Sequence, residues 1–305
     1  MGKIAFVFAG QGAQHPGMGS DLCQNFGAAR RVFEQADAIR PGTARQCFEG
    51  TDEELKATSN TQPCMFAVEL AAAAALHSEG IHADMAAGFS LGELAALTYA
   101  GAMDFGTGFR LVKRRGELMQ KASELYPTAM AAVLKLSNEQ VEELCAKFKQ
   151  IYPVNYNCPG QVSVSGAADE MPAFSAAVKE AGGRAVPLKV AGAFHSPFMK
   201  IAEVDFIKEM DRFPFRHPHI PVYSNYTAQP YGDNVPDLLG KQLCHPVLWE
   251  QSVRNMIAEG VDTFLELGPG RTLCTLIGKI DNTVRALPVS NSEELKAAAA
   301  EVQSC

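Results

Sequence analysis

The stretch Gly88-Phe89-Ser90-Leu91-Gly92-Glu93 constrains the fold of this chain more than any other. It matches the pattern G-x-S-x-G; small and apolar residues lead into it, and a helix-forming run follows it. A strand, a tight turn with glycines around a serine, and a helix form a nucleophile elbow, which lifts the serine hydroxyl clear of the sheet. Glycines are needed because a Cβ would meet neighbouring backbone. Ser90 is therefore the predicted nucleophile; a chance match in a chain with 26 glycines is the alternative.

The composition is that of an ordinary globular protein, with 47% hydrophobic and 20% charged residues in a chain of 305. A net charge of −7 argues against nucleic acid as the main partner, which would call for a basic surface. No apolar run is long enough to span a membrane, and residues 2–9 resemble a buried strand more than a signal peptide. The eight cysteines form no CxxC pair and no zinc-like spacing. We therefore expect a cytoplasmic protein with reduced thiols.

The first part of the chain alternates apolar runs with helical patterns. Residues 3–9 form a near-continuous apolar run, which is typical of a central parallel strand covered on both faces. The glycine-rich loop at residues 10–19 matches neither a phosphate-binding loop nor a dinucleotide fingerprint, so it is either a functional loop at a strand end or a flexible connector. Helical patterns follow at residues 21–38, 51–58, 61–76 and 105–126.

The middle of the chain has a different pattern, in which strands and helices follow the order β-α-β-β-α-β. The predicted elements are at residues 129–136, 137–148, 152–157, 161–166, 169–181 and 184–190. This order predicts a ferredoxin-like unit. Strands and helices then alternate again over residues 198–280, which implies a mostly parallel sheet. We therefore expect a large α/β-hydrolase-like domain at residues 1–127 and 191–305, with a small ferredoxin-like domain inserted at 128–190.

A serine nucleophile needs a base, and one of the seven histidines has a suitable setting. His195 follows the last strand of the inserted unit, and loops that leave strand ends at a domain boundary line clefts. Its apolar neighbours fit a hydrogen-bonded core histidine equally well. No carboxylate between Ser90 and His195 is a convincing third member of a triad, because residues such as Glu117 and Asp169 belong to helix surfaces. The predicted site therefore departs from that of ordinary esterases.

Eight short motifs occur along the chain in this order: Gly10-Gln11-Gly12-Ala13-Gln14, Thr61-Gln62-Pro63, Gly88-Phe89-Ser90-Leu91-Gly92-Glu93, Arg115-Gly116-Glu117-Leu118-Met119-Gln120, Asn157-Cys158-Pro159-Gly160-Gln161, Gly192-Ala193-Phe194-His195-Ser196-Pro197, Pro246-Val247-Leu248-Trp249 and Glu266-Leu267-Gly268-Pro269-Gly270. Together they resemble the malonyl-CoA:acyl carrier protein transacylases of bacterial fatty-acid synthesis, over nearly the whole chain. One difference is Phe89, where that family usually has histidine. Because Phe89 lies beside the nucleophile, we expect it to alter packing or rate and not the type of reaction.

The resemblance implies a reaction and the residues that perform it. Ser90 would attack the thioester of malonyl-CoA, and His195 would take its proton and give it to the leaving thiol. The backbone N–H groups of Gln11 and Leu91 would stabilise the oxyanion. A backbone carbonyl would orient the histidine, which accounts for the missing carboxylate; by motif position it belongs to Leu248. The malonyl group would then pass from Ser90 to the phosphopantetheine thiol of acyl carrier protein, with ping-pong kinetics.

The resemblance also implies how the substrate is held. Arg115 would pair with the malonyl carboxylate through its planar guanidinium, and Gln62 would help to position both. Asn157 and Gln161 would line the cleft from the small domain, and Phe194 would limit the size of the acyl group. No metal or redox cofactor is implied. The expected protein is a monomer whose partners are malonyl-CoA and acyl carrier protein.

Three alternatives to this function are open at this point. A discrete malonyl acyltransferase of a polyketide pathway has the same chemistry. A serine thioesterase or esterase would let water reach the acyl-enzyme, and Arg115 would then have no reason to face the pocket. A catalytically inactive carrier-binding subunit would not need Ser90 and His195. Sustained release of CoA only when a thiol acceptor is added in excess, with little hydrolysis, would separate a transacylase from the last two.

Overall fold

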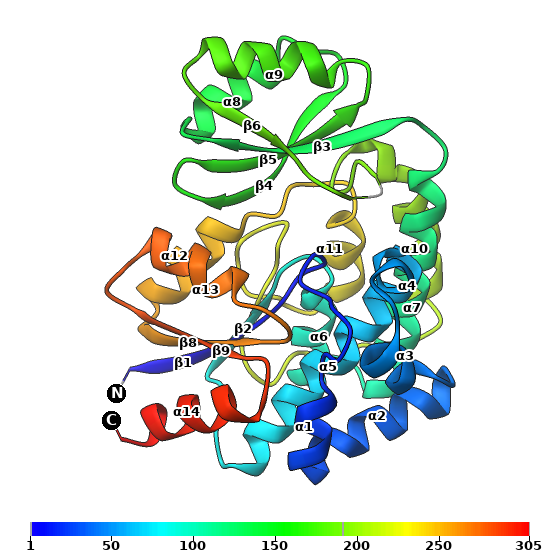
Figure 1. Ribbon diagram of the computed structural model, residues 1–305, viewed down its shortest axis with the longest axis vertical. Coiled ribbons are helices and arrows are strands. Elements are labelled where there is room, and N and C mark those ends of the chain that lie inside the picture. Colours follow the sequence, from blue (N-terminus) through cyan, green and yellow to red (C-terminus); the bar gives the residue numbers. More distant parts are fainter. Residues whose placement is uncertain (1, 191, 305) are drawn as a thin grey trace.

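The computed structural model describes residues 2–190 and 192–304. Within that part of the chain the strands form two sheets, which lie one above the other in Figure 1. The larger sheet has five strands in the order β7-β2-β1-β8-β9, and its strand pairs are all parallel. The smaller sheet has four strands in the order β4-β5-β3-β6, and its pairs are all antiparallel. The α/β class predicted from the sequence is confirmed.

The larger sheet is covered on both faces, as buried parallel strands require. Its strands are β1 (Lys3–Phe8), β2 (Met85–Gly88), β7 (Val222–Tyr223), β8 (Val261–Leu267) and β9 (Arg285–Val289). In β1, Ile4, Phe6 and Phe8 belong to one hydrophobic core, and Ala5 and Val7 belong to another. Successive side chains of a strand point to opposite faces, so a strand between two cores is apolar throughout. The run at residues 3–9 is therefore the central strand that the sequence predicted.

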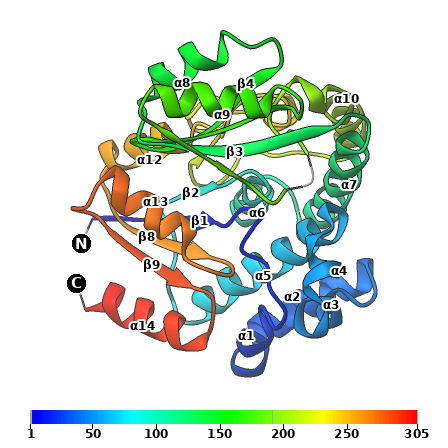
Figure 2. The same ribbon diagram turned by 45° about the horizontal axis from the view of Figure 1, so that its top comes forward.

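Helices from the first part of the chain, together with the last helix, cover one face of this sheet, and two other helices cover the opposite face (Figures 1 and 2). The alanine-rich helix α5 (Thr58–Ser78) is buried on nearly all sides, which explains why it is apolar all round. On the first face it packs with α1 (Ser20–Asn25), α2 (Gly27–Ile39), α3 (Thr43–Glu49), α4 (Asp52–Lys56), α6 (Gly92–Tyr99), α7 (Phe105–Ser123) and α14 (Ser292–Gln303). The opposite face carries α12 (Trp249–Ala258) and α13 (Thr272–Ile280).

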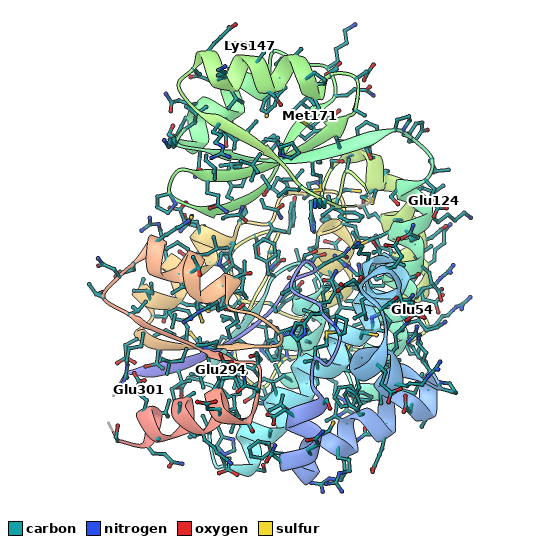
Figure 3. The ribbon with its side chains drawn as sticks, in the orientation of Figure 1. Glu54, Glu124, Lys147, Met171, Glu294 and Glu301 are labelled. Carbon is teal, nitrogen blue, oxygen red and sulfur yellow. The ribbon has the colours of Figure 1, made fainter. Side chains whose placement is uncertain are left out.

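The smaller sheet has the ferredoxin-like arrangement that the sequence predicted, with β5 and β3 in the centre. Its elements are β3 (Thr128–Leu134), α8 (Asn138–Cys145), β4 (Ile151–Cys158), β5 (Gln161–Ala167), α9 (Met171–Glu180) and β6 (Arg184–Pro187). Helices α8 and α9 cover one face through a core that includes Val133, Val164 and Phe174. In Figure 3, Lys147 and Met171 mark this outer, helical side. The other face of the sheet is thereby left to meet the larger domain.

The chain returns from the smaller sheet through a loop and the short helix η1 (Pro197–Met199). Helices α10 (Lys200–Met210) and α11 (Val235–Lys241) follow, and α10 packs against both α7 and α11. In Figure 1 these three helices lie on the same side of the molecule, below the smaller sheet. The return loop and the end of α11 therefore come to lie next to the turn that follows β2.

Candidate active site

A cavity of about 310 Å³ lies between the two sheets. The large domain contributes the ends of β1 and β2 and the start of α13, and the small domain contributes β4 and β5. This is where ligands bind in open α/β folds, beyond the carboxyl ends of the parallel strands. Eight residues predicted from the sequence line it: Gln11, Gln62, Ser90, Leu91, Asn157, Gln161, Phe194 and His195.

Ser90 stands on the predicted elbow, between β2 and α6. Its φ of 55° lies in the left-handed region, which is unusual for a residue other than glycine. A Cβ added to Gly88 would lie 1.9 Å from the Gly92 backbone, and one added to Gly92 would lie 2.3 Å from the Phe8 carbonyl oxygen. Both glycines are therefore required by the close approach of the chain around Ser90.

His195 is in direct contact with the serine hydroxyl. Its Nε2 lies 2.7 Å from Ser90 Oγ, and its Nδ1 lies 2.8 Å from the carbonyl oxygen of Gln242. A carbonyl only accepts, so Nδ1 carries the proton and Nε2 is free to accept the serine proton. Burial and, after it, the charge of Arg115 lower the pKa of His195 to about 4. The imidazole is therefore neutral near pH 7 and can act as a base.

The prediction that Leu248 provides the orienting carbonyl was wrong. Leu248 is the N-cap residue of α12, and its carbonyl accepts hydrogen bonds from Ser252 N at 3.0 Å and Ser252 Oγ at 2.9 Å. Gln242 is the C-cap residue of α11. Carbonyl groups at the end of a helix have no partner within it and carry partial negative charge, so they suit the N–H of a histidine. The chain uses such a helix end in place of a carboxylate.

Arg115 reaches the same serine from α7. Its side chain is fully buried, and it donates from Nη2 to Ser90 Oγ at 3.1 Å and to Gln242 Oε1 at 2.7 Å. Its Nη1 donates to Gln62 Oε1 at 3.0 Å, as predicted for that pair. Burial lowers its pKa to about 10, so it stays charged near neutral pH. Among the described residues, its Nε has no hydrogen-bond partner. A buried cation with a spare donor beside the nucleophile suits an anionic acyl group.

The predicted oxyanion donors lie at the same cavity. Gln11 follows the end of β1, and Leu91 directly follows the nucleophile; both line the cavity. In residues 2–190 and 192–304, neither backbone N–H has a hydrogen-bond acceptor. Two free N–H groups beside a serine are what an oxyanion requires.

The small domain contributes polar side chains to the cavity. Asn157 donates to Ser163 Oγ at 3.1 Å, and Gln161 accepts from Lys279 Nζ at 3.3 Å, across the junction with α13. Asn155 also lines the cavity, although no sequence motif marks it. Asn157 and Gln161 therefore line the cavity wall; Asn157 bonds to the neighbouring strand β5, and Gln161 bonds to α13 of the large domain.

Two aromatic residues complete the walls. Phe194 is 7% exposed and lines the cavity next to His195. Phe89 also lines it, and its ring packs against Trp249 with the ring centroids 5.5 Å apart. That an aromatic ring beside the nucleophile alters packing or rate, and not the type of reaction, stays a prediction.

Two further residues support the site and have no signature in the sequence. Asn225 accepts from Ser90 N at 2.7 Å and donates to Gly88 O at 2.6 Å, which holds both sides of the elbow. Gln242 contributes its side chain as well as its carbonyl: Nε2 donates to Ser90 O at 2.7 Å. Asn225 follows a two-residue strand and Gln242 follows a short helix, so no local pattern marks either.

The rest of the described chain shows neither a metal-binding cluster nor a membrane-spanning helix. No group of three or more histidine, cysteine or carboxylate side chains within it could hold a metal ion. None of its helices combines the length and the apolar character that a membrane span requires. The cysteines between residues 23 and 274 are free thiols. A hollow of about 720 Å³ near Tyr126 and Phe198 contains none of the predicted site residues.

Comparison with known proteins agrees with this geometry. The family model of the acyl transferase domain matches residues 5–296. The malonyl CoA-acyl carrier protein transacylase of Bacillus subtilis (strain 168) is 38% identical over 98% of this chain and 96% of that protein. The one from Staphylococcus aureus (strain MSSA476) is 36% identical over 97% of this chain and 98% of that protein.

Solved structures give the same result. The crystal structure of the malonyl CoA-acyl carrier protein transacylase from Clostridium perfringens ATCC 13124 superposes with a TM-score of 0.96 and is 34% identical, covering 99% of this chain and 98% of that one. A malonyl-transacylase in complex with its type II PKS acyl-carrier protein gives a TM-score of 0.94 at 34% identity, covering 98% and 99%. The chain belongs to the acyl transferase domain family and, within it, to the malonyl CoA-acyl carrier protein transacylases.

Proposed function

We propose that this protein transfers the malonyl group of malonyl-CoA to the phosphopantetheine thiol of acyl carrier protein, through an ester on Ser90. One observation carries the proposal: Ser90 Oγ lies within hydrogen-bond distance of both His195 Nε2, at 2.7 Å, and Arg115 Nη2, at 3.1 Å. A base activates the nucleophile, and a cation selects the acyl group that the nucleophile meets. The names of the relatives support the same substrate pair.

The first half of the reaction forms the ester. Ser90 Oγ attacks the thioester carbonyl while its proton moves to His195 Nε2, and the Gln242 carbonyl stabilises the resulting imidazolium. The N–H groups of Gln11 and Leu91 stabilise the oxyanion. When the tetrahedral intermediate collapses, the C–S bond breaks and the CoA sulfur takes the proton from His195. The malonyl group is then an ester of Ser90.

The second half repeats these steps with a different thiol. The phosphopantetheine thiol loses its proton to His195 and attacks the ester carbonyl, and Ser90 leaves with the proton that His195 returns. The malonyl carboxylate pairs with Arg115 in both halves, because an unpaired charge in this cavity would be strongly disfavoured. Asn157, Gln161 and Phe194 form the walls around the acyl group.

The proposal includes how the protein is organised and where it works. We assign residues 1–127 and 191–305 to the large domain and 128–190 to the small one, because all four strands of the smaller sheet fall between residues 128 and 187. The protein acts as a monomer, since one chain supplies every group of the site. It acts in the cytoplasm, where free thiols such as the buried Cys47 and Cys64 persist.

The pathway has two candidates. Type II fatty-acid synthesis is the main one. A polyketide pathway is the second, because one similar structure is a malonyl-transacylase with its type II PKS acyl-carrier protein. The chemistry at Ser90 is the same in both. Transfer rates to a fatty-acid and to a polyketide carrier protein, measured side by side, separate them.

The dependence of CoA release on an acceptor tests the proposal against a hydrolase. With malonyl-CoA alone, we expect release of one equivalent of CoA per enzyme and then almost no further release. Added acyl carrier protein carrying its phosphopantetheine should restore continuous release, with malonyl found on the carrier. Continuous release without any thiol acceptor would identify a thioesterase instead.

Substitution of Phe194 should change the choice of acyl group. Phe194 lines the cavity and directly precedes His195, so its ring would crowd the α-carbon of a bound acyl group. Phe194→Ser should raise the methylmalonyl-to-malonyl ratio of kcat/KM by about ten- to a few-hundredfold, since one methyl group in an apolar pocket is worth about 1–3 kcal/mol. Competition between the two thioesters measures this ratio, and an unchanged ratio would place selectivity elsewhere.

A further inference from the structure

A buried carboxylate, Glu93, lies directly beneath the elbow and has no part in the reaction described above. It is in the first turn of α6, and it is fully buried. Its Oε1 accepts from the Tyr231 hydroxyl at 2.6 Å and from Asn225 N at 2.9 Å. Its Oε2 accepts from Gln242 Nε2. Every neighbour in this network donates, so the network suits an ionised carboxylate.

The orientation of the Gln242 amide follows from the atoms around it. A guanidinium has donors only, so the Gln242 atom 2.7 Å from Arg115 Nη2 must be the oxygen. The nitrogen of the amide then faces two acceptors, Ser90 O at 2.7 Å and Glu93 Oε2. If a donor replaced this carboxylate oxygen, the amide could not satisfy its neighbours in either orientation.

Gln242 therefore touches all three groups that the reaction uses. Its side-chain oxygen holds Arg115, its side-chain nitrogen holds the Ser90 backbone, and its own carbonyl holds His195 Nδ1 at 2.8 Å. We propose that Glu93 is a positioning residue for malonyl transfer: its carboxylate fixes Gln242, and Gln242 in turn orients Arg115, Ser90 and His195. The choice of malonyl as the acyl group in this inference rests on the proposed function. The hydrogen bonds that connect Glu93 to the site do not depend on it.

The charges around Glu93 support the same role. Burial raises its pKa to about 7, while hydrogen bonds from Tyr231, Asn225 and Gln242 and the charge of Arg115 act in the opposite direction. Arg115 in turn has its pKa lowered by burial and raised by Glu93. Above pH 7 a buried cation, Arg115, and a buried anion, Glu93, are therefore connected through Gln242. The rates below are best compared at pH 8, where Glu93 is ionised.

Glu93→Gln, compared with Arg115→Ala, separates this role from simple structural support. The variant has one acceptor oxygen where the carboxylate has two, so its amide nitrogen must face either Gln242 Nε2 or the donors Tyr231 and Asn225 N, with little change in volume. Two probes are used. Phenylmethylsulfonyl fluoride is uncharged; Ser90 Oγ attacks its sulfur, fluoride leaves, and His195 takes the proton, so its rate reports the nucleophile with a probe that has no carboxylate for Arg115 to bind. Single-turnover acylation by malonyl-CoA reports the nucleophile and Arg115 together.

In Glu93→Gln we expect both rates to fall by about ten- to a hundredfold, the effect of losing a hydrogen bond to a charged group. In Arg115→Ala the malonyl rate should fall much further than the sulfonyl fluoride rate, because only malonyl-CoA needs the cation for binding. The matched control is Glu69→Gln, which also replaces a fully buried carboxyl but one with no hydrogen-bond partner in the described chain. It should leave both rates unchanged. If folded Glu93→Gln keeps either rate within about threefold of the wild-type value, which is about 0.6 kcal/mol, the inference is wrong.

Tyr231→Phe covers the case in which Glu93→Gln fails to fold. It removes one donor to the carboxylate and keeps the charge, so both rates should fall several-fold with a normal melting temperature. Unchanged rates in that variant would overturn the inference. The wild-type protein separates the two proposals: if it reacts with the sulfonyl fluoride and does not accept malonyl, the proposed function fails, and the sulfonyl fluoride rates still decide the role of Glu93.

Discussion

Arg115→Ala should lose about 2–5 kcal/mol of transition-state binding for malonyl-CoA, the range for removing one partner of a buried charge pair. The guanidinium is fully buried and lies 3.1 Å from the nucleophile, so no solvent replaces it for the malonyl carboxylate. Acetyl transfer should stay level or rise, since acetyl-CoA leaves the buried cation unpaired in the wild-type protein. The measurement is kcat/KM for both thioesters in both proteins.

Two variants make the Arg115 result specific. Arg115→Lys should rescue malonyl transfer only in part, because a point charge cannot make paired hydrogen bonds to a carboxylate. Arg114→Ala removes the neighbouring arginine of the same helix, whose side chain is 43% exposed and pairs with Glu117, so it should behave as wild type. A fall of malonyl and acetyl transfer by the same factor in Arg115→Ala would make Arg115 a structural residue.

His195→Ala should lower kcat by about 10²- to 10⁴-fold, the usual contribution of general acid–base catalysis. The expectation follows from the 2.7 Å contact between Nε2 and Ser90 Oγ and from the neutral ring that its lowered pKa of about 4 provides. Malonyl-CoA binding should change little, because Arg115 stays in place.

A steady-state assay with saturating malonyl-CoA measures the effect of His195→Ala. The matched control is His217→Ala, since the His217 side chain is 65% exposed and its ring lies within 3.2 Å of Asp233 Oδ1, away from Ser90. Loss of activity in the control, or retention of more than about a tenth of it in His195→Ala, would argue against the assigned base.

Residues whose role depends on local sequence were predictable. Ser90 was found because an elbow needs glycines on both sides of it, and the close approach of Gly88 and Gly92 to the backbone confirms that reason. The ferredoxin-like unit followed from the periodicity of its strands and helices. His195 was found from its place in the chain, after the last strand of that unit.

The residues that the sequence missed act through the backbone or through distant contacts. Every residue has a carbonyl group, so composition cannot show that Gln242 and not Leu248 orients His195; the end of α11 decides it. Asn225 has no local pattern, and its contact with Ser90 spans 135 residues of sequence. Such contacts exist only once the chain has folded.

Two differences in the fold have local causes. Strand β9 was missed because it contains Arg285 and Pro288, which are poor signals for a strand but are tolerated at the edge of a sheet, where β9 lies. The single helix predicted at residues 21–38 is two helices, α1 and α2. Phe26 between them has an extended φ of −127°, which ends the first helix and begins the second.

Identification of the acylated residue tests most directly whether malonyl transfer passes through Ser90. The protein is incubated with malonyl-CoA, quenched in acid, and examined by intact mass and peptide mapping; acyl carrier protein with its phosphopantetheine is then added to a parallel sample. We predict one malonyl group on Ser90, none in Ser90→Ala, and its quantitative transfer to the carrier. A stable malonyl group on any cysteine, or an ester on Ser90 that water removes faster than the carrier does, would contradict the account.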